Sequence, residues 1–233
     1  PYYRASAYVE EAVGSLLAQT HRNLEVVVVN DGSFEPEDEV LGNLDRDPRV
    51  RVVHQLNNGD ASARNLGIEL ARGSYLLMFD ADNALEPEFV SRAVGMLQAD
   101  PRLAYVTCWL RFVDADGREL DGRGYAPLGN RVLRGRGEEE NWDGDTIALF
   151  PRRALEALEP TFAPGAAMHA DWLLYRRLRA REEYGAVIPE LLARYRVHSR
   201  SLLRSHEGWL HRLNWEEGRD LRRLEETRWV AEA

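Results

Sequence analysis

Asp80 and Asp82, two aspartates separated by one residue, come directly after an apolar run and form the most informative acidic pair of the chain. Two carboxylates at this spacing can hold a hard divalent cation that keeps water and substrate phosphate among its ligands. The pair Asp114 and Asp116 has the same spacing, but Gly117 follows it, which favours a turn whose aspartate bonds its own backbone. The first pair therefore predicts a cation site and the second does not.

Elements in the first hundred residues can bring such acids to one place. Runs rich in apolar and β-branched residues predict strands over 24–30, 50–54 and 75–79, and helical spacing predicts helices over 6–19, 36–44, 61–71 and 87–99. We expect Ser6 to cap the first helix. Strands and helices that alternate with short connections indicate an α/β fold with a doubly wound, mostly parallel sheet. Such sheets bind ligands at the carboxyl ends of their strands, where Asp31 and Asp80 both lie.

The periodicity changes after residue 100. Residues 103–113 predict an extended segment turned at 114–117, 121–141 a long loop, 146–150 a strand, 151–158 a helix, 171–183 a helix and 194–197 a last strand before His198. We therefore expect one domain over residues 1–204, with a parallel half over 1–100 and a smaller mixed or antiparallel half over 101–204. Residues 205–233 predict a charged, amphipathic helical tail.

Composition excludes several classes of function. The 233 residues carry 30 basic and 39 acidic side chains, a net charge of −9 and no strong basic cluster, so we expect no nucleic-acid partner. Cys108 is the only cysteine, which rules out an internal disulfide and fits a cytoplasmic location. The longest apolar runs have the length of strands, so we expect no transmembrane segment in these residues. Peripheral contact of the tryptophan-bearing tail with the inner face of a membrane stays open.

Four motifs, taken in order, are similar to the donor half of family 2 glycosyltransferases with the GT-A fold. They are VNDGS at 29–33, NG at 58–59 with ARNLGI at 63–68, ARGSY at 71–75 and FDADN at 79–83. The similarity continues through ALFPRRAL at 148–155, HADW at 169–172, IPE at 188–190 and RYRVH at 194–198, and so covers residues 1–205. The resemblance implies a GT-A fold, with the nucleotide-sugar-binding half over 1–100 and the acceptor and catalytic half over 101–204.

The same resemblance implies a reaction. Family 2 glycosyltransferases include inverting enzymes that move a sugar from a nucleotide diphosphate sugar to an acceptor hydroxyl. The resemblance therefore implies this reaction, here with a UDP-sugar as the expected donor. The expected cofactor is Mg²⁺ or Mn²⁺, and the expected acceptor is a carbohydrate, a lipid-linked molecule or another hydroxyl compound.

Individual residues take roles by the resemblance alone. Nucleotide-sugar contacts are implied for Pro1, Tyr3, Asp31, Arg64 and Asp80. Metal contacts are implied for Asp80, Asp82 and His198. Asp171 corresponds to the general base that takes a proton from the acceptor hydroxyl. Ala170 departs from the family, which carries glutamate at this position, and the departure bears on the acceptor.

Other interpretations stay open at this stage. Asp31 can stabilise a turn, Arg64 can lie on a solvated helix face, and Asp171 can cap a helix. A nucleotidyltransferase of related fold is a second function, although residues 4–6 and the lack of lysine do not supply its basic phosphate loop. A non-catalytic or degenerate sugar-nucleotide-binding domain is a third, favoured by Ala170 and by residues 1–3, which match only the end of the family's first strand. We therefore expect the sheet formed by these residues to lack most of a central strand.

Overall fold

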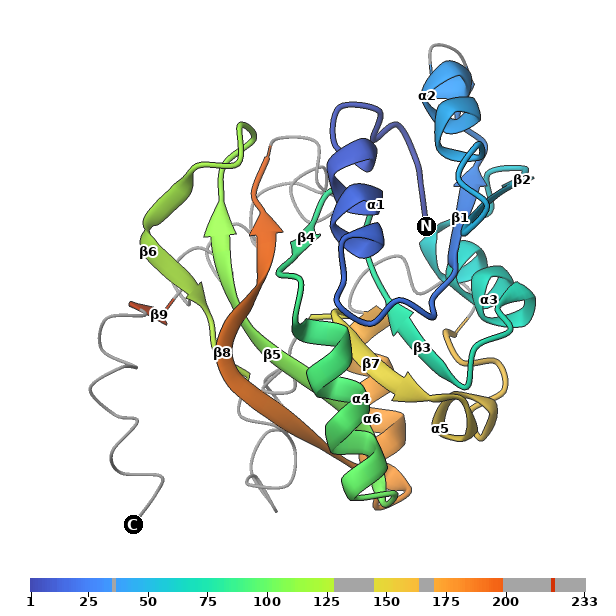
Figure 1. Ribbon diagram of the computed structural model, residues 1–233. Helices are drawn as coiled ribbons and strands as arrows, with labels where there is room; N and C mark the ends of the chain where they lie inside the picture. The colour runs from blue at the N-terminus through green and yellow to red at the C-terminus, as the bar shows by residue number, and fades with distance from the viewer. Residues whose placement is uncertain (35–36, 128–144, 164–169, 199–218, 221–233) are drawn as a thin grey trace.

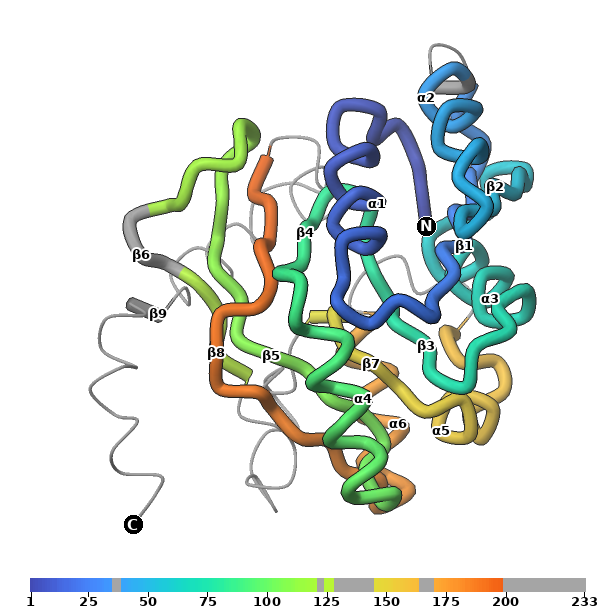
Figure 2. The backbone as a smooth tube through the Cα atoms, viewed as in Figure 1, coloured from blue at the N-terminus to red at the C-terminus, as the bar shows by residue number. Residues whose placement is uncertain are grey.

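The computed structural model describes residues 1–34, 37–127, 145–163, 170–198 and 219–220 of the chain (Figure 1). Its elements are, in order, α1 (Val9–Leu17), β1 (Val26–Asp31), α2 (Glu37–Leu44), β2 (Val50–Gln55), α3 (Asp60–Leu70), β3 (Tyr75–Met78), β4 (Ala84–Leu85), α4 (Phe89–Ala99), β5 (Leu103–Val113), β6 (Glu119–Tyr125), β7 (Ala148–Pro151), α5 (Arg152–Glu156), α6 (Ala170–Ala180), β8 (Tyr184–Arg196) and β9 (Arg219–Asp220). The tube in Figure 2 follows the same path from α1 to β8. The α/β class predicted from the sequence is confirmed.

β1 and β2 form a parallel pair at one side of the molecule. Their register ends with Asp31 opposite Gln55, so both residues lie at the carboxyl edge of the pair. Tyr2 extends the pairing on the other side of β1, because its amide donates to the Val29 carbonyl at 2.8 Å and its carbonyl accepts from the Asp31 amide at 2.9 Å. These bonds hold residues 1–3 beside the end of β1.

A larger mixed sheet contains the strands of the second half. Its order is β3-β7-β5-β6-β9, with β8 parallel to β5 and β4 antiparallel to β8. The short strand β4 matters for the site because it follows residues 80–83 directly and places Ala84 opposite Arg194 of β8. The segment with the Asp80 and Asp82 pair is thereby fastened to the carboxyl end of β8.

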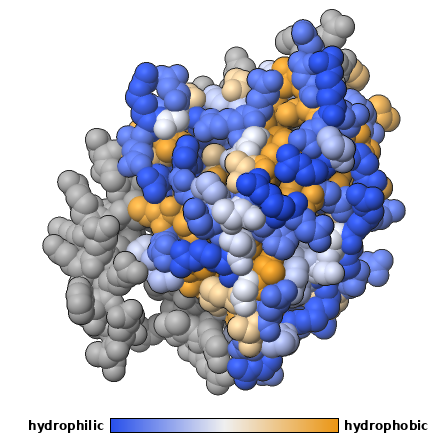
Figure 3. All heavy atoms as spheres, viewed as in Figure 1, coloured by the Kyte–Doolittle hydropathy of each residue, from blue (hydrophilic) through white to orange (hydrophobic). Residues whose placement is uncertain are grey.

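A groove of about 720 Å³ lies between β1 and β3. Apolar residues of both strands line it, together with residues of α1, α3 and α4. Figure 3 shows apolar surface in this region, between α1 and β1. Among the described residues β1 and β3 belong to separate sheets and share no pairing.

Three apolar clusters hold the layers together. In the first, Phe89 and other residues of α4 pack on β5 and β8. In the second, α5 and α6 pack against β3, β5 and β7 through side chains that include Tyr105, Phe150 and Tyr175. Figure 1 shows α4 in front of these strands and α6 behind them. The third joins α1 and α2 to β1 and β2. The β1–β2 pair and the larger mixed sheet are therefore each stabilised by their own packed helices.

Several predicted boundaries are wrong. Ser6 is not the cap of α1, which begins at Val9 after Tyr8 and has no side-chain cap bond. The start of the loop predicted over 121–141 is instead part of β6. Its glycines are unfavourable in a strand, but backbone pairing with β5 stabilises the strand despite them. β8 begins at Tyr184, where a helix end was predicted, because register shifts against β5 interrupt its alternation of buried and exposed residues.

The predicted tail lies mostly outside the described residues, as does the remainder of the predicted loop. Arg219–Asp220 are the described part of the tail, and they form β9, antiparallel to β6, instead of helix. Within the described ranges no helix has both the length and the apolar character needed to cross a bilayer.

Candidate active site

Asp31 ends β1 as a buried carboxylate that is 4% exposed. Its Oδ1 accepts hydrogen bonds from Gln55 Nε2 at 2.7 Å and from the Asn58 amide at 2.8 Å, and its Oδ2 accepts from the Gly59 amide at 2.9 Å. A carboxylate offers about four acceptor positions, so one remains for a further donor. Asp31 thus stabilises the turn before α3, as the structural interpretation predicts, and keeps room for one N–H or O–H of a ligand.

Residues 1–3 lie beside this carboxylate. Pro1 is within electrostatic range of Arg64, Asp80 and Asp31. Tyr3 is 47% exposed and stands at the rim of the site. An exposed aromatic ring at this edge can stack on a nucleobase. The structure therefore brings both predicted contacts of residues 1–3 to the same strand edge as Asp31.

Arg64 supplies a buried positive charge from α3 and is 7% exposed. Its Nε donates to Asp60 Oδ2 at 2.7 Å, its Nη2 donates to Asp80 Oδ1, and its guanidinium carbon lies 5.6 Å from the ring centroid of Phe162. Burial lowers the pKa of Arg64, but Asp80 and Asp60 outweigh this and raise it above its usual value, so the group stays charged. Its Nη1 is buried and has no partner among the described residues, which leaves donors for an anionic ligand.

Asp80 faces this guanidinium at the end of β3. Burial raises the pKa of Asp80 above its usual value, Arg64 opposes the rise, and Asp60 and Asp82 add to it. Crowded carboxylates that repel one another gain when a cation binds between or beside them. The charge balance at Asp80 therefore favours a positively charged ligand.

Asp82 and His198 lie side by side although they are 116 residues apart in the sequence. Asp82 Oδ2 lies 3.0 Å from His198 Nε2, and the His198 ring centroid lies 4.7 Å from that of Tyr8, the residue before α1. The side chain of Asp82 is 24% exposed and that of His198 only 8%. His198 is therefore not a lone surface histidine, and two of the three predicted metal ligands share one place.

The donor atoms fit Mg²⁺ or Mn²⁺ held jointly with a substrate. One carboxylate and one imidazole face each other, and ions of this kind are commonly bound through one or two carboxylates while phosphate and water complete the coordination. Within the described ranges no three His, Cys, Asp or Glu side chains form a ready cage.

Asp145 is a member of the site that the sequence did not indicate. It precedes β7, its Oδ1 accepts from the Ile147 amide at 3.2 Å, and its carbonyl accepts from the Tyr175 hydroxyl at 2.8 Å. Burial raises the pKa of Asp145 well above its usual value, and repulsion from Asp80 and Asp171 adds to the rise. A carboxyl group in these surroundings binds a proton or a positive ligand readily.

Asp171 lies in the first turn of α6, inside the helix and not at its cap position. Burial raises the pKa of the nearby Tyr195 hydroxyl well above its usual value, and Asp145, Asp82, Asp80 and Asp171 all contribute to that rise. Carboxylates from three separate parts of the chain therefore lie within electrostatic range of one tyrosine. Asp171 shares this range with the Asp80 and Asp82 pair.

Two residues of the site escaped the sequence argument for different reasons. Asp60 pairs with Arg64 at an i,i+4 spacing, one helical turn away, but it lies just before the helix predicted over 61–71. Asp145 stands outside every motif, next to residues 128–144, and its role depends on how β7 packs. No local pattern in the sequence marks it.

Comparison with known proteins bears on the family. A family model described as glycosyl transferase family 2 matches residues 1–158. The uncharacterised glycosyltransferase EpsJ of Bacillus subtilis (strain 168) is 40% identical over 93 residues, which is 40% of this chain and 27% of EpsJ. The chondroitin synthase of Pasteurella multocida (strain Pm70) is 38% identical over 126 residues, which is 54% of this chain and 13% of that protein. The chain thus spans less than two thirds of the length of these relatives.

Solved structures bear on the fold. The structure of S. aureus TarS 1-349 in complex with UDP-GlcNAc matches with a TM-score of 0.68 at 17% identity, over 90% of this chain and 60% of that chain. The same protein in complex with UDP matches with a TM-score of 0.64 at 17% identity, over 85% of this chain and 59% of that chain. At this level of identity the likeness concerns the fold, and it confirms the expected GT-A type.

Proposed function

This chain belongs to glycosyl transferase family 2, and from that membership we propose that it is an inverting glycosyltransferase acting on a nucleotide diphosphate sugar. The observation that carries the proposal is that Asp80 pairs with the buried Arg64 and Asp82 faces His198, while Asp171 lies within electrostatic range of Tyr195 together with both aspartates. A UDP-sugar is the proposed donor, because TarS, which shares the fold, is described in complex with UDP and with UDP-GlcNAc.

The donor is proposed to bind along the carboxyl edge of β1 and β3. Asp31 retains one acceptor position for the base, Tyr3 offers an exposed ring beside it, and Arg64 holds an unpartnered, buried Nη1 for the diphosphate. Asp80, held by Arg64, is placed to accept a ribose hydroxyl or to contribute to the cation. These contacts would fix the leaving group before an acceptor enters.

Asp82 and His198 are the proposed holders of Mg²⁺ or Mn²⁺, with Asp80 nearby. When bound, the cation supplies positive charge that offsets the negative charge developing on the departing nucleotide diphosphate. Arg64 adds a fixed positive charge from the other side of Asp80.

Asp171 is the proposed general base. It would take the proton of the acceptor hydroxyl while that oxygen attacks the anomeric carbon and the bond from that carbon to the diphosphate oxygen breaks. A single displacement of this kind inverts the anomeric configuration. The acceptor is proposed to be a carbohydrate, a lipid-linked molecule or another hydroxyl compound, and the single, buried Cys108 is in keeping with the proposed cytoplasmic location.

The test of this function separates binding from transfer. We expect both the wild-type chain and Asp171→Asn to bind UDP. Isothermal titration calorimetry with Mn²⁺ present measures this binding. Release of UDP from a panel of UDP-sugars, with carbohydrate acceptors added, should fall by about 10²- to 10⁴-fold in Asp171→Asn. The matched control is Asp116→Asn, which removes an exposed carboxylate of the β5–β6 turn and should leave both measurements unchanged. Unchanged turnover in Asp171→Asn would remove Asp171 from the mechanism.

A non-catalytic sugar-nucleotide-binding domain is the second candidate, favoured by Ala170 at the start of α6, where the family carries glutamate. Its signature in the same experiment is UDP binding by the wild-type chain without UDP release for any sugar or acceptor. Full transfer in the presence of EDTA would instead retain the transferase and remove the cation from it.

A further inference from the structure

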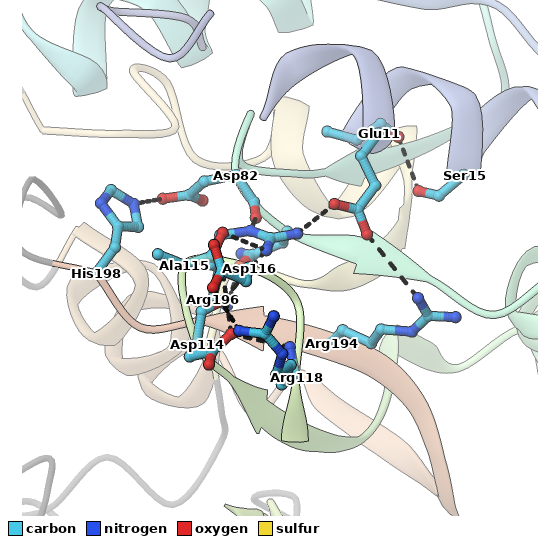
Figure 4. A network of polar contacts seen from close by, with 12 residues as sticks. Glu11, Ser15, Asp82, Asp114, Ala115, Asp116, Arg118, Arg194, Arg196 and His198 are labelled. Carbon is cyan, nitrogen blue, oxygen red and sulfur yellow. Dashed lines mark hydrogen bonds and ion pairs between the residues drawn. The ribbon is translucent and has the colours of Figure 1, made fainter. Parts of the chain in front are cut away.

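Arg196 is a buried arginine at the end of β8, 3% exposed, and it holds the loop of residues 80–83, called here the acidic loop. Its Nε donates to the Asp82 carbonyl at 2.8 Å, and its main-chain amide donates to Asn83 Oδ1 at 3.0 Å. Two groups of a single residue therefore fix consecutive residues of the acidic loop. Figure 4 shows the Arg196 guanidinium at the centre of this network, between Asp82 and Glu11.

The rest of this guanidinium reaches two other elements. Its Nη1 donates to the carbonyls of Asp114 and Ala115 in the β5–β6 turn, at 3.2 Å each, and its Nη2 donates to Glu11 of α1. The ring centroid of Tyr8, also at α1, lies 4.9 Å from the guanidinium carbon, and the same ring packs against His198. One side chain thus joins the acidic loop to α1 and to the β5–β6 turn.

We propose that Arg196 is a positioning residue, which fixes the main chain of Asp82 so that the Asp82 carboxylate and the His198 imidazole face the same ligand. The bond goes to the Asp82 carbonyl and leaves the carboxylate available. Groups behind a metal ligand orient it, and losing one costs about 10- to 100-fold in metal affinity. This inference rests on the proposed function, because it assigns Arg196 to the hold on the cation and the diphosphate.

The network requires the shape of arginine as well as its charge. A guanidinium is planar and presents five N–H donors in a fixed fork, and here donors on all three nitrogens are used in different directions. Lysine keeps the charge but offers three donors from one point, so it cannot reach the acidic loop, the β5–β6 turn and α1 together. Arg196→Lys therefore removes the positioning and retains the buried positive charge.

Arg194 provides a matched control on the same strand. Its side chain is 40% exposed, and its ion pairs are with Glu86 at 3.0 Å and Glu11 at 3.9 Å, outside the acidic loop. Arg194→Lys makes the same chemical change two residues away, so it reports what an arginine-to-lysine change in β8 does by itself.

The experiment titrates UDP into the full chain at increasing MnCl₂ and follows binding by calorimetry, with a thermal melt of each variant. We expect the Mn²⁺ concentration for half-maximal UDP binding to rise about 10- to 100-fold in Arg196→Lys, with saturating Mn²⁺ restoring binding. The same concentration should change by less than about twofold in Arg194→Lys, whose lost contacts are exposed. Donor turnover, measured in parallel, should show the same Mn²⁺ shift with kcat retained at saturation.

The outcomes separate this inference from the proposed function. No UDP binding by the wild-type chain at any Mn²⁺ concentration would contradict the proposed function itself. If the wild-type chain binds UDP and Arg196→Lys needs no more Mn²⁺ than the wild type, the positioning role is overturned. The role is also overturned if Arg196→Lys loses UDP binding and saturating Mn²⁺ does not restore it, because such a loss indicates a general disruption of the fold. If Arg196→Lys does not fold, Glu11→Ala replaces it, because it keeps Arg196 and removes one acceptor of its guanidinium. A shift of about tenfold supports the role and an unshifted value overturns it.

Discussion

The chain contains two Asp-Ala-Asp segments, and their carboxylates have different kinds of partner in the structure. At Asp80 and Asp82 the carboxylates face groups from distant elements, Arg64 of α3 and His198 after β8. In the second segment Asp114 accepts from amides two and four residues further along the chain. The first segment therefore assembles a site, whereas the second closes a β-turn by itself, as its glycine predicts.

The difference teaches that burial and partners, rather than spacing, decide what an acidic pair does. The ion pair of Arg64 with Asp80 has side chains 6% and 28% exposed, whereas that of Arg118 with Asp116 has side chains 75% and 69% exposed. A charge taken out of water has to be matched by another, while an exposed pair competes with water and salt. Arg196 nevertheless touches both segments, so the β-turn contributes indirectly by supporting the acidic loop.

The largest expected effect comes from removing the buried cation. Arg64→Leu leaves Asp60 and Asp80 without their shared partner, so we expect the free energy of unfolding to fall by about 3–5 kcal/mol. Arg118→Leu, the matched change in the second segment, should cost less than about 1 kcal/mol. Urea unfolding of both variants measures the two costs. Equal losses would contradict the contrast drawn between the two segments.

The next effect concerns the carboxylates themselves. Asp82→Asn keeps the size of the side chain but weakens its hold on a cation, and we expect donor turnover to fall by at least about 100-fold. Asp116→Asn makes the same change in the exposed turn and should alter the rate by less than about twofold. Initial rates at fixed Mn²⁺ test the pair. A similar loss in both variants would show that the two acidic pairs act alike.

The sequence predicts both acidic segments well, because each follows from local pattern. β1 is an apolar run that ends in Asp31, and the apolar run of β3 is followed within two residues by Asp80, so the strand ends and Asp31, Asp80 and Asp82 follow from local pattern. The glycine after Asp116 likewise identifies the turn, and Gly117 has φ +82°. These features depend on the preferences of neighbouring residues.

What the sequence could not predict depends on long-range packing. Asp145 lies in the site because β7 pairs between β3 and β5. No pattern in the neighbouring sequence indicates that this carboxylate belongs to a site. The end of β8 was predicted as a strand over 194–197, but its first ten residues were not, because its register against β5 shifts and breaks the alternation that marks a strand. The roles of Asp171 as base and of His198 as metal ligand stay predictions, since the structure shows their location and not the reaction.

A pH-dependent effect is expected at Asp145. Because burial raises the pKa of Asp145, the folded state binds its proton more tightly than the unfolded state, whose aspartate titrates near about 3.9. Stability is therefore lost as the pH rises above that value, and Asp145→Asn should raise the Tm at pH 7 by at least about 2 °C. The gain should vanish near pH 3.5, where the wild-type carboxyl is protonated. Melting curves at both pH values decide; a gain that persists at low pH would contradict the charge argument.

The smallest effect should come from exchanging the residue that follows each acidic pair. Gly117 adopts φ +82°, a conformation that asparagine tolerates better than other residues, and a Cβ there would meet Arg196 Nη1 at an ordinary contact distance of 3.5 Å. Gly117→Asn should therefore cost less than about 1 kcal/mol and leave the Mn²⁺ requirement unchanged. Asn83→Gly, the reverse exchange in the acidic loop, loses a buried acceptor for the Arg196 amide and should cost about 1–3 kcal/mol. Urea unfolding and UDP titration compare the two variants. Equal losses in the free energy of unfolding would mean that the residue after each acidic pair does not distinguish the acidic loop from the β5–β6 turn.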